Sequence, residues 1–512
     1  MPEEQKEQKP EEKKKDEYPL EVDKEPVVTE HSIEIDGEKI DYTVTVGMLP
    51  IRNETGSEVE AGVFFIAYTK KPPAPESQQS TVDSPQSKVK GPKSKVQSLN
   101  SPRPLMFSFN GGPGSSSVWL HLGAVGPKRV ELLEDGGLPP APYKLSDNPF
   151  TWFSETDLVF IDPVGTGYSR PKDKEMGKKF WGLKGDIESV GEFIRLYLSR
   201  YNRWGSPLFL VGESYGTTRA SGLAGHLIEK GIAFNGILLV SSILNFLTAR
   251  WFKGNDLPNI LFLPTYAATA WYHGKVAKKY RGDLQGMLRE VEAFTMGPYS
   301  AALAKGENLP ARERQAIVSR LAEFTGLSKR YIEQTNLRIE IHPFCKELLR
   351  DEGRTVGRLD SRFKGIDPRL IAERPEFDPS MTMIRPPYTA MLNDYVSRVL
   401  GYKTDAPYNI MGGMFEQWDW GSAGEGTPDV SESLRKAFAR NPHMKLFVAS
   451  GYYDLATPYF ATKHTLAHMG LDADVRGNVT TGEYEAGHMM YIHAESLRKL
   501  KADVTKFIRA AL

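Results

Sequence analysis

Gly212-Glu213-Ser214-Tyr215-Gly216 places a serine between two glycines, directly after the apolar run 207–211 and before a stretch of helical character, 217–230. A serine on a sharp strand-to-helix turn needs strained backbone angles, and glycines on either side let the strand and the helix approach closely. The pattern alone also fits an ordinary glycine-rich turn. Because the next apolar run, 236–242, indicates another buried strand, we interpret Ser214 as a nucleophile exposed on a strand–turn–helix unit.

Two later segments can supply an acid and a base for this serine. The apolar run 445–451 predicts a strand that Asp454 follows, and His488 follows a strand predicted over 475–484. An α/β-hydrolase has its triad in the order serine, acid and histidine, each in a loop that leaves a strand. We therefore expect an α/β-hydrolase fold with a central, mostly parallel sheet and the triad Ser214, Asp454 and His488.

Both partners of the serine have alternative interpretations. Asp454 could serve only to cap the helix that begins at Thr457-Pro458, and His488 could only bond a neighbouring carbonyl. His493 is the other candidate base, but it lies further from the strand end, where the last helix should begin. The position directly after a strand favours His488.

A glycine-rich loop can supply the donors that the reaction needs. The strand predicted over 105–110 runs into the loop 111–117, whose backbone can approach a substrate closely. The amides of Gly112 and of Tyr215, the residue after the serine, are the expected oxyanion hole. The loop lacks the lysine and hydroxyl of a phosphate-binding P-loop and contains Pro113 where an amide would be needed, which argues against nucleotide binding.

Five stretches of the chain occur in the order found in one enzyme family. They are Asn110-Gly111-Gly112-Pro113-Gly114-Ser115-Ser116-Ser117, Asp162-Pro163-Val164-Gly165-Thr166-Gly167-Tyr168-Ser169, Gly212-Glu213-Ser214-Tyr215-Gly216, Gly451-Tyr452-Tyr453-Asp454 and Ala486-Gly487-His488-Met489. Through them the chain resembles the serine carboxypeptidases, acid-active exopeptidases with an α/β-hydrolase fold. The resemblance implies the same catalytic residues as above: Ser214, Asp454 and His488 as the triad, and Gly112 and Tyr215 as the oxyanion hole.

The resemblance also implies a carboxylate-binding pair, Asn110 and Glu213, that grips the C-terminus of the substrate. Eukaryotic members usually have a tryptophan, a cysteine and a glutamate where this chain has Ser108, Ser115 and Ala124. The run 118–127 resembles bacterial members instead, so we assign the chain to a bacterial-type branch. Without that glutamate and tryptophan, strict carboxypeptidase activity and a strongly acidic pH optimum stay open.

Composition agrees with one large enzyme. The 512 residues are 40% hydrophobic and include 8 Trp, 22 Tyr and 24 Phe, which is ample material for a core. The formal net charge is zero, which gives no reason to expect nucleic acid or an anionic membrane as a partner. We find no apolar run near 20 residues and expect no transmembrane segment. The single cysteine, Cys345, excludes an intrachain disulfide, and nothing predicts the oligomeric state.

Residue patterns divide the chain into four parts. Residues 1–26 are expected to be a disordered charged tail, and 27–245 the first part of the hydrolase core, with a mobile loop at about 71–104 that is rich in Pro, Ser and Lys. Residues 246–440 are expected to be a mainly helical insertion that caps the site, and 441–512 the second part of the core. The tail has no hydrophobic segment of a signal peptide, so the chain as written is expected in the cytoplasm, or exported if a leader has been omitted.

The chemistry expected from these residues is acyl transfer by a serine hydrolase. The expected reaction is hydrolysis of C-terminal peptide bonds, with peptides that have a free C-terminus as the partners and with no metal or cofactor implied. Three alternatives remain open: an esterase or acyltransferase with the same triad, an aminopeptidase-like or endopeptidase variant, and a catalytically silent binding protein on the same scaffold.

Overall fold

The computed structural model describes residues 20–72, 103–421 and 427–512 of the chain. Of the tail predicted over 1–26, residues 1–19 lie outside the described residues, as do residues 73–102 of the loop predicted over 71–104. No helix in these described ranges is both long and apolar enough to cross a membrane.

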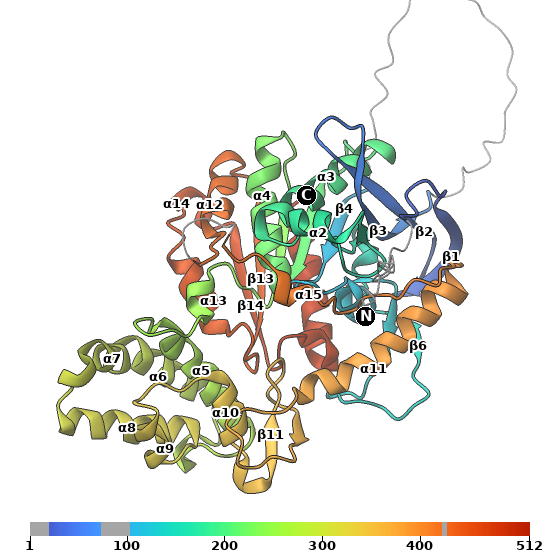
Figure 1. Cartoon of the computed structure of the whole chain (residues 1–512). Coiled ribbons are helices and arrows are strands. Elements are labelled where there is room, and N and C mark those ends of the chain that lie inside the picture. Colours follow the sequence, from blue (N-terminus) through green and yellow to red (C-terminus); the bar gives the residue numbers. More distant parts are fainter. Residues whose placement is uncertain (1–19, 73–102, 422–426) are drawn as a thin grey trace, which may run out of the picture.

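One mixed sheet forms the centre of the molecule (Figure 1). Its first strands, β1 (Val27–Ile35), β2 (Glu38–Arg52) and β3 (Val59–Lys70), pair antiparallel, and β3 also pairs antiparallel with β7 (Asp157–Ile161) and the short β8 (Arg170–Pro171). From β7 onward the strands pair parallel in the order β4 (Leu105–Phe109), β9 (Leu208–Glu213), β10 (Gly236–Val240), β13 (Lys445–Gly451) and β14 (Val479–Tyr484).

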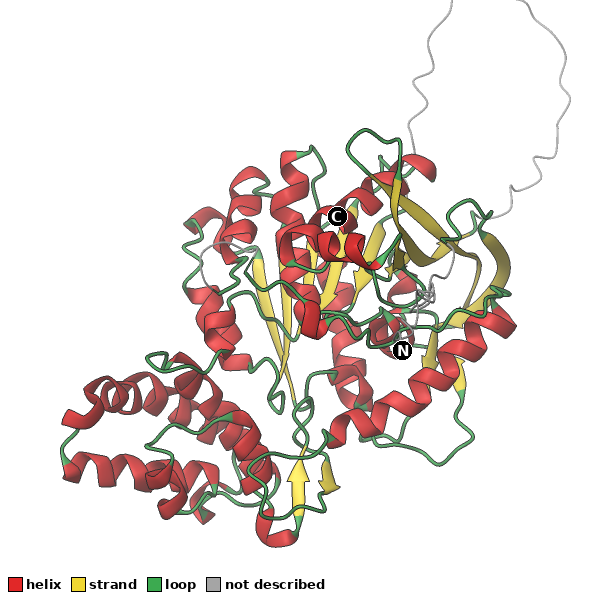
Figure 2. Cartoon of the chain, in the orientation of Figure 1, coloured by secondary structure: helices red, strands yellow, loops and turns green. Residues whose placement is uncertain are grey.

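Helices cover both faces of the parallel strands, which explains why the central strands β4, β7, β9 and β10 are buried along their whole length (Figure 2). Successive strand residues point to opposite faces. Met106 and Val211 pack in the cluster that contains α15 (Ala494–Ala510), whereas Phe107 and Leu210 pack in the cluster that contains α3 (Leu183–Arg200) and α4 (Tyr215–Glu229). The sheet is therefore held between two hydrophobic layers.

The shorter elements of the core surround this sheet. They are α1 (Val118–Leu120), η1 (His121–Val125), β5 (Lys128–Val130), β6 (Leu145–Asp147), η2 (Trp152–Ser154), α2 (Lys174–Phe180), α12 (Ser431–Arg440), α13 (Tyr459–Ala467), α14 (Ala473–Arg476) and η10 (Met490–Ile492).

A helical lobe follows β10 in the chain and has a hydrophobic cluster of its own (Figure 1). Its elements are η3 (Phe246–Ala249), α5 (Leu257–Tyr272), η4 (Lys278–Tyr280), α6 (Leu284–Phe294), η5 (Thr295–Tyr299), α7 (Ser300–Lys305), η6 (Gly306–Asn308), α8 (Ala311–Thr325), α9 (Lys329–Gln334), α10 (Ile341–Glu347) and η7 (Arg350–Glu352). The chain returns through β11 (Arg354–Val356), β12 (Lys364–Ile366), α11 (Pro379–Asp394), η8 (Tyr395–Val399) and η9 (Phe415–Gln417). Tyr453 and Leu455, which flank the predicted acid, pack into the lobe's cluster and link it to the site.

Two boundaries differ from the sequence-based expectation. The strand predicted over 475–484 begins only at Val479, because Asp472 accepts a hydrogen bond from the Asp474 amide and caps the helical turn α14. The helix α12, which falls inside the predicted insertion 246–440, packs through its apolar face in the same cluster as α4, beside the sheet. An amphipathic helix pattern shows that one face is buried but not which element buries it.

Candidate active site

Ser214 occupies a strained turn between β9 and α4. Its φ of 60° is unusual for a residue with a side chain. A Cβ atom on Gly212 would lie 2.1 Å from the carbonyl oxygen of Gly216, so only glycine lets the strand and the helix approach this closely. The turn places half-buried Ser214 at the carboxyl edge of the sheet.

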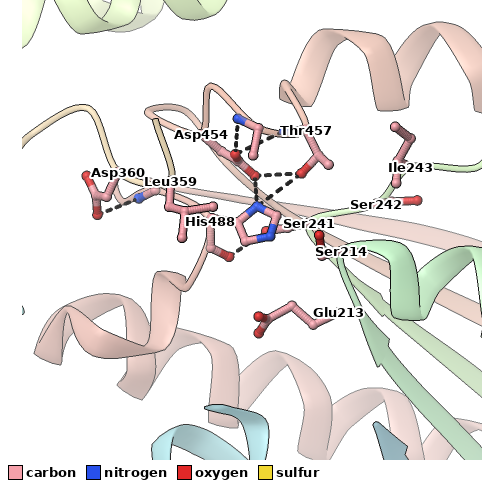
Figure 3. A network of polar contacts seen from close by, with 12 residues as sticks. Glu213, Ser214, Ser241, Ser242, Ile243, Leu359, Asp360, Asp454, Thr457 and His488 are labelled. Carbon is pink, nitrogen blue, oxygen red and sulfur yellow. Dashed lines mark hydrogen bonds and ion pairs between the residues drawn. The ribbon is translucent and has the colours of Figure 1, made fainter. Parts of the chain in front are cut away.

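The structure brings the predicted acid and base together beside this serine (Figure 3). Asp454 follows β13 and His488 follows β14, and these strands are parallel neighbours whose carboxyl ends lie at one edge of the sheet. The Asp454 Oδ2 atom lies 2.7 Å from His488 Nδ1, and Ser214 lies next to the imidazole and lines the same pocket. His493, the alternative base, instead has its Nδ1 2.9 Å from the Ser496 hydroxyl at the start of α15.

The fully buried Asp454 carboxylate bonds its own turn as well as the imidazole. Its Oδ1 accepts hydrogen bonds from the amides of Ala456 (2.7 Å) and Thr457 (3.0 Å), and its Oδ2 accepts one from the Thr457 hydroxyl at 2.7 Å. The helix α13 begins only at Tyr459, with Pro458 at its N-cap. Asp454 therefore does not cap that helix, and these bonds fix the orientation of the carboxylate toward His488.

The acid also sets the protonation of the base. Burial by itself would lower the pKa of His488, but the charge of Asp454 and the hydrogen bond to it raise that pKa above its ordinary value. Because an ionised carboxylate only accepts hydrogen bonds, the proton of the neutral ring resides on Nδ1. The other ring nitrogen is then free to accept a proton, which is what a general base requires.

The base loop is anchored by a segment that the sequence patterns did not single out. We call residues 358–361, between β11 and β12, the clamp segment. The amide of His488 donates a 2.7 Å hydrogen bond to the carbonyl of Leu359, and the amide of Gly487 donates a 3.1 Å bond to the Asp360 carboxylate. Figure 3 shows Leu359 beside the His488 loop. A Cβ on Gly487 would lie 2.5 Å from Asp360, so a glycine is needed for this approach.

The same clamp segment holds the acid loop. The Leu455 amide donates to the Arg358 carbonyl at 3.0 Å, and the Ser361 amide and hydroxyl both donate to the Tyr453 carbonyl at 3.0 Å. Asp360 is itself fixed by a bidentate ion pair with Arg362 (Nε to Oδ1 3.0 Å, Nη2 to Oδ2 2.7 Å). One segment of the insertion thus bonds the loops on both sides of the Asp454–His488 pair.

The predicted carboxylate-binding pair forms a buried polar cluster. Asn110 Nδ2 donates a 2.9 Å hydrogen bond to Glu213 Oε1, and the Asn110 Oδ1 accepts the Leu120 amide at 3.0 Å. The hydroxyl of Tyr491 donates to Glu213 Oε2 at 2.5 Å. Burial raises the pKa of Glu213 to about 7, so this carboxyl retains a proton in mildly acidic solution. Tyr491 had no motif that would have marked it in the sequence.

The two predicted oxyanion donors, Gly112 and Tyr215, are both positioned near the serine. Gly112 lines the same pocket as Ser214, and Tyr215 is the first residue of α4, where a helix leaves its amides without intrahelical partners. Within the described residues, neither amide donates a backbone hydrogen bond. Both are therefore available to an oxygen atom bound next to Ser214, although their role stays a prediction.

A pocket of about 360 Å³ opens at this site. Its polar residues include Asn110, Glu213, Ser214 and His488. Apolar side chains make up much of the remaining wall: Trp119, Met381, Ile384, Met411 and Met489. An arrangement of one nucleophile, one oriented base and a buried carboxyl in a mostly apolar pocket can perform acyl transfer on a substrate that carries an anionic group.

Comparison with known proteins points to one family. The sequence profile of the serine carboxypeptidases matches residues 94–289. Serine carboxypeptidase-like 36 of Arabidopsis thaliana is 32% identical over 148 residues, which are 28% of this chain and 29% of that protein. The pheromone-processing carboxypeptidase KEX1 of Saccharomyces cerevisiae is 38% identical over 126 residues, which are 23% of this chain and 16% of that protein. The chain therefore spans only a minor part of the length of these curated relatives.

A solved structure extends the similarity over most of the chain. The crystal structure of KEX1(delta)p, a prohormone-processing carboxypeptidase from Saccharomyces cerevisiae, covers 91% of this chain and 91% of its own, with a TM-score of 0.53 and 17% identity. At this identity the match shows a shared fold, and it confirms the α/β-hydrolase fold predicted from the sequence. Residues 94–289 are thus similar to the serine carboxypeptidase family, and the fold of the chain is that of the α/β-hydrolases.

Proposed function

We propose that the chain is a serine-type carboxypeptidase that removes the C-terminal residue of a peptide through an acyl-enzyme on Ser214. The observation that supports this most strongly is the buried carboxyl cluster: Asn110 and Glu213 line the same pocket as the serine, and Tyr491 bonds Glu213. A hydrolase for uncharged esters would have no use for a protonated acid held by two donors at the place where substrate binds.

The reaction begins when His488 takes the proton of the Ser214 hydroxyl as its oxygen attacks the scissile carbonyl carbon. The amides of Gly112 and Tyr215 stabilise the oxyanion that forms, and Asp454 stabilises the resulting imidazolium. His488 then gives the proton to the leaving nitrogen, and the C–N bond breaks. Water, deprotonated by His488, hydrolyses the acyl-enzyme by the same steps.

The carboxyl cluster would bind the C-terminal carboxylate of the substrate. A protonated Glu213 can donate a hydrogen bond to that carboxylate, whereas an ionised Glu213 would repel it in a poorly solvated pocket. The pKa of about 7 therefore suits carboxylate recognition at mildly acidic pH. Asn110 can add its side-chain amide as a second donor.

We also propose, on sequence grounds, that the chain represents a bacterial-type branch of the family. The proposal depends on Ser108, Ser115 and Ala124, where eukaryotic members usually have Trp, Cys and Glu. In this chain Tyr491 bonds the second oxygen of Glu213. The relatives compared above come from a plant and a yeast, so the branch stays a prediction.

The proposed function is tested with N-blocked dipeptides that have either a free or an amidated C-terminus, assayed beside p-nitrophenyl esters. A carboxypeptidase should hydrolyse the free-carboxyl peptide with a higher kcat/KM than its amide. Equal rates on both peptides would favour an endopeptidase, and cleavage of the esters alone would favour an esterase or acyltransferase. If the wild-type protein hydrolyses none of these substrates and Ser214 does not react with a serine-hydrolase probe, the result would favour the catalytically silent binding protein.

A further inference from the structure

Arg358 lines the active-site pocket, and its guanidinium has no role in the structure described so far. Its backbone is fully used, because the amide donates to Asp378 at 3.0 Å and the carbonyl accepts the Leu455 amide at 3.0 Å. Its half-buried side chain forms no hydrogen bond or ion pair with any residue of the described ranges 20–72, 103–421 and 427–512. The backbone is thus held in place while the guanidinium stays available to a ligand.

The charge of Arg358 acts inside the site. It opposes Asp454 at His488, where it lowers the pKa of the imidazole by repulsion. Among the described residues, the other cationic side chain that lines this pocket is His488 itself, when protonated. A negatively charged ligand would therefore meet Arg358 as the permanent positive charge of the pocket.

Asp378 is a carboxylate in the same wall, but its acceptor atoms are already engaged. Its Oδ1 accepts the amides of Arg358 and Ser380, both at 3.0 Å, and the Ser380 hydroxyl, and its Oδ2 accepts the Leu359 amide at 3.3 Å. These bonds cap the N-terminus of α11 and hold the carboxylate against the backbone. Within the part of the chain that the structure describes, no ion pair joins Asp378 to the Arg358 guanidinium, so Arg358 can still bind another anion.

The pocket arrangement suggests which anion this is. Under the proposed function, Asn110 and Glu213 bind the α-carboxylate of the C-terminal residue, so the side chain of that residue must occupy the rest of the same pocket. There it meets apolar walls from Trp119 and Ile384 and the cation of Arg358. A side chain with an apolar stem and a terminal carboxylate satisfies both features, and a charge pair is strengthened where water is excluded.

We propose that Arg358 is a specificity-determining residue that binds the side-chain carboxylate of a C-terminal acidic residue. This inference rests on the proposed carboxypeptidase function. Arg358 takes no part in breaking the peptide bond. It acts by binding an acidic C-terminal residue, Glu or Asp, better than the corresponding neutral residue, Gln or Asn.

Four N-blocked dipeptides that differ only in their last residue, Glu, Gln, Asp or Asn, test this assignment. Wild-type kcat/KM should be about tenfold or more higher for Glu than for Gln, as expected for a hydrogen bond to a charged group. The ratio should fall to about one in Arg358→Gln and stay intermediate in Arg358→Lys, which keeps the charge but loses the planar fork. Arg435→Gln, on the exposed face of α12, is the matched control and should keep the wild-type ratio.

The same measurements show whether Arg358 binds the side-chain carboxylate or the α-carboxylate of the substrate. If Arg358 instead binds the α-carboxylate, Arg358→Gln should lower the rates on the Glu and Gln peptides by the same factor and leave their ratio unchanged. A wild-type ratio near one, or an unchanged ratio in Arg358→Gln, would overturn the proposal. Circular dichroism and the rate of Ser214 labelling by a small fluorophosphonate show whether each variant is folded.

Binding measurements keep this inference distinct from the proposed function. The Ser214→Ala protein should bind the Glu peptide about tenfold more tightly than the Gln peptide in calorimetric titrations. The wild-type enzyme could cleave no peptide while the Ser214→Ala protein still binds the Glu peptide more tightly, and Arg358→Gln removes that preference. In that case the carboxypeptidase proposal fails, but the proposed anion-binding role of Arg358 is supported. Equal affinities for the two peptides would overturn the site whatever the enzyme hydrolyses.

Discussion

The amide of His488 donates a 2.7 Å hydrogen bond to the carbonyl oxygen of Leu359. This bond ties the proposed catalytic base to the clamp segment, which belongs to the long insertion between β10 and β13 and not to the sheet that supports the base. The position of the imidazole thus depends on how the insertion packs. Because small displacements of a catalytic group reduce rates strongly, the insertion should influence chemistry as well as substrate access.

Removal of the clamp's carboxylate tests this dependence. In Asp360→Ala, buried Arg362 loses its partner and the Gly487 amide loses its acceptor, so the free energy of unfolding should fall by about 3–5 kcal/mol. At a temperature where the variant is folded, kcat should fall more than KM changes, because the base loop is displaced. Asp360→Asn, whose amide oxygen can still accept the Gly487 hydrogen bond, should recover part of kcat.

The control variant Glu432→Ala removes an exposed ion pair on α12 and should change neither the free energy of unfolding nor kcat. A loss of stability with an unchanged kcat would contradict the positioning role.

A fluorophosphonate probe should label Ser214, because the elbow exposes its hydroxyl beside His488. Ser214→Ala should abolish both labelling and hydrolysis while the thermal unfolding temperature stays close to the wild-type value. Mass spectrometry of the labelled peptide identifies the modified residue. Labelling at Ser115 or Ser169 would refute the assignment of the nucleophile.

Asp454→Asn should lower kcat by roughly 10⁴-fold, because an amide next to His488 favours the wrong imidazole tautomer. Steady-state kinetics on the best ester substrate measure this effect without involving the carboxylate site. The corresponding changes at Asp472 and Asp474, which lie at the start of α14, provide matched controls. A nearly neutral Asp454→Asn variant would show that the acid was assigned wrongly.

Changes in the carboxyl cluster should separate substrates by their C-terminus. Asn110→Ala should reduce kcat/KM for free-carboxyl peptides by about ten- to a hundredfold, as expected for the loss of one hydrogen bond to a charged group, and barely affect amidated peptides. Tyr491→Phe removes the 2.5 Å hydrogen bond that orients Glu213 and should cause a loss of about tenfold on the same peptides. If both substrate classes lost activity equally, the cluster would have a structural role only.

The pH dependence should also differ between these substrates. Activity on amidated peptides and esters should rise with pH as His488 loses its proton. Because the pKa of His488 is raised, this rise should occur at a higher pH than for an ordinary histidine. Activity on free-carboxyl peptides should in addition fall as pH rises through about 7, where Glu213 ionises and repels the substrate. The Tyr491 hydrogen bond lowers the pKa of Glu213, so Tyr491→Phe should move this falling limb to higher pH. Identical pH profiles of kcat/KM for both classes would exclude a carboxylate-binding role for Glu213.

Local patterns are sufficient to select the residues that we propose as nucleophile, acid and base. Each lies in the loop that leaves a strand, and the apolar runs of β9 and β13 are visible in the sequence. The strand predicted from residue 475 begins at Val479 in the structure, because the mixture of apolar and polar residues at 475–478 is compatible with both a strand and a helical turn. Tyr491 and the clamp segment were missed because their contacts join parts of the chain with no shared local pattern.

The sequence by itself determined the local backbone at the site. At position 212 a Cβ atom would lie only 2.1 Å from the Gly216 carbonyl oxygen, so the turn requires glycine, and such steric requirements are set by residue type alone. The tertiary structure decided the chemistry of the side chains, since solvation and partner charges depend on which distant segments pack together. Only packing buries Glu213 and raises its pKa to about 7, brings residues 358–361 against the loops of Asp454 and His488, and places Arg358 in the pocket wall.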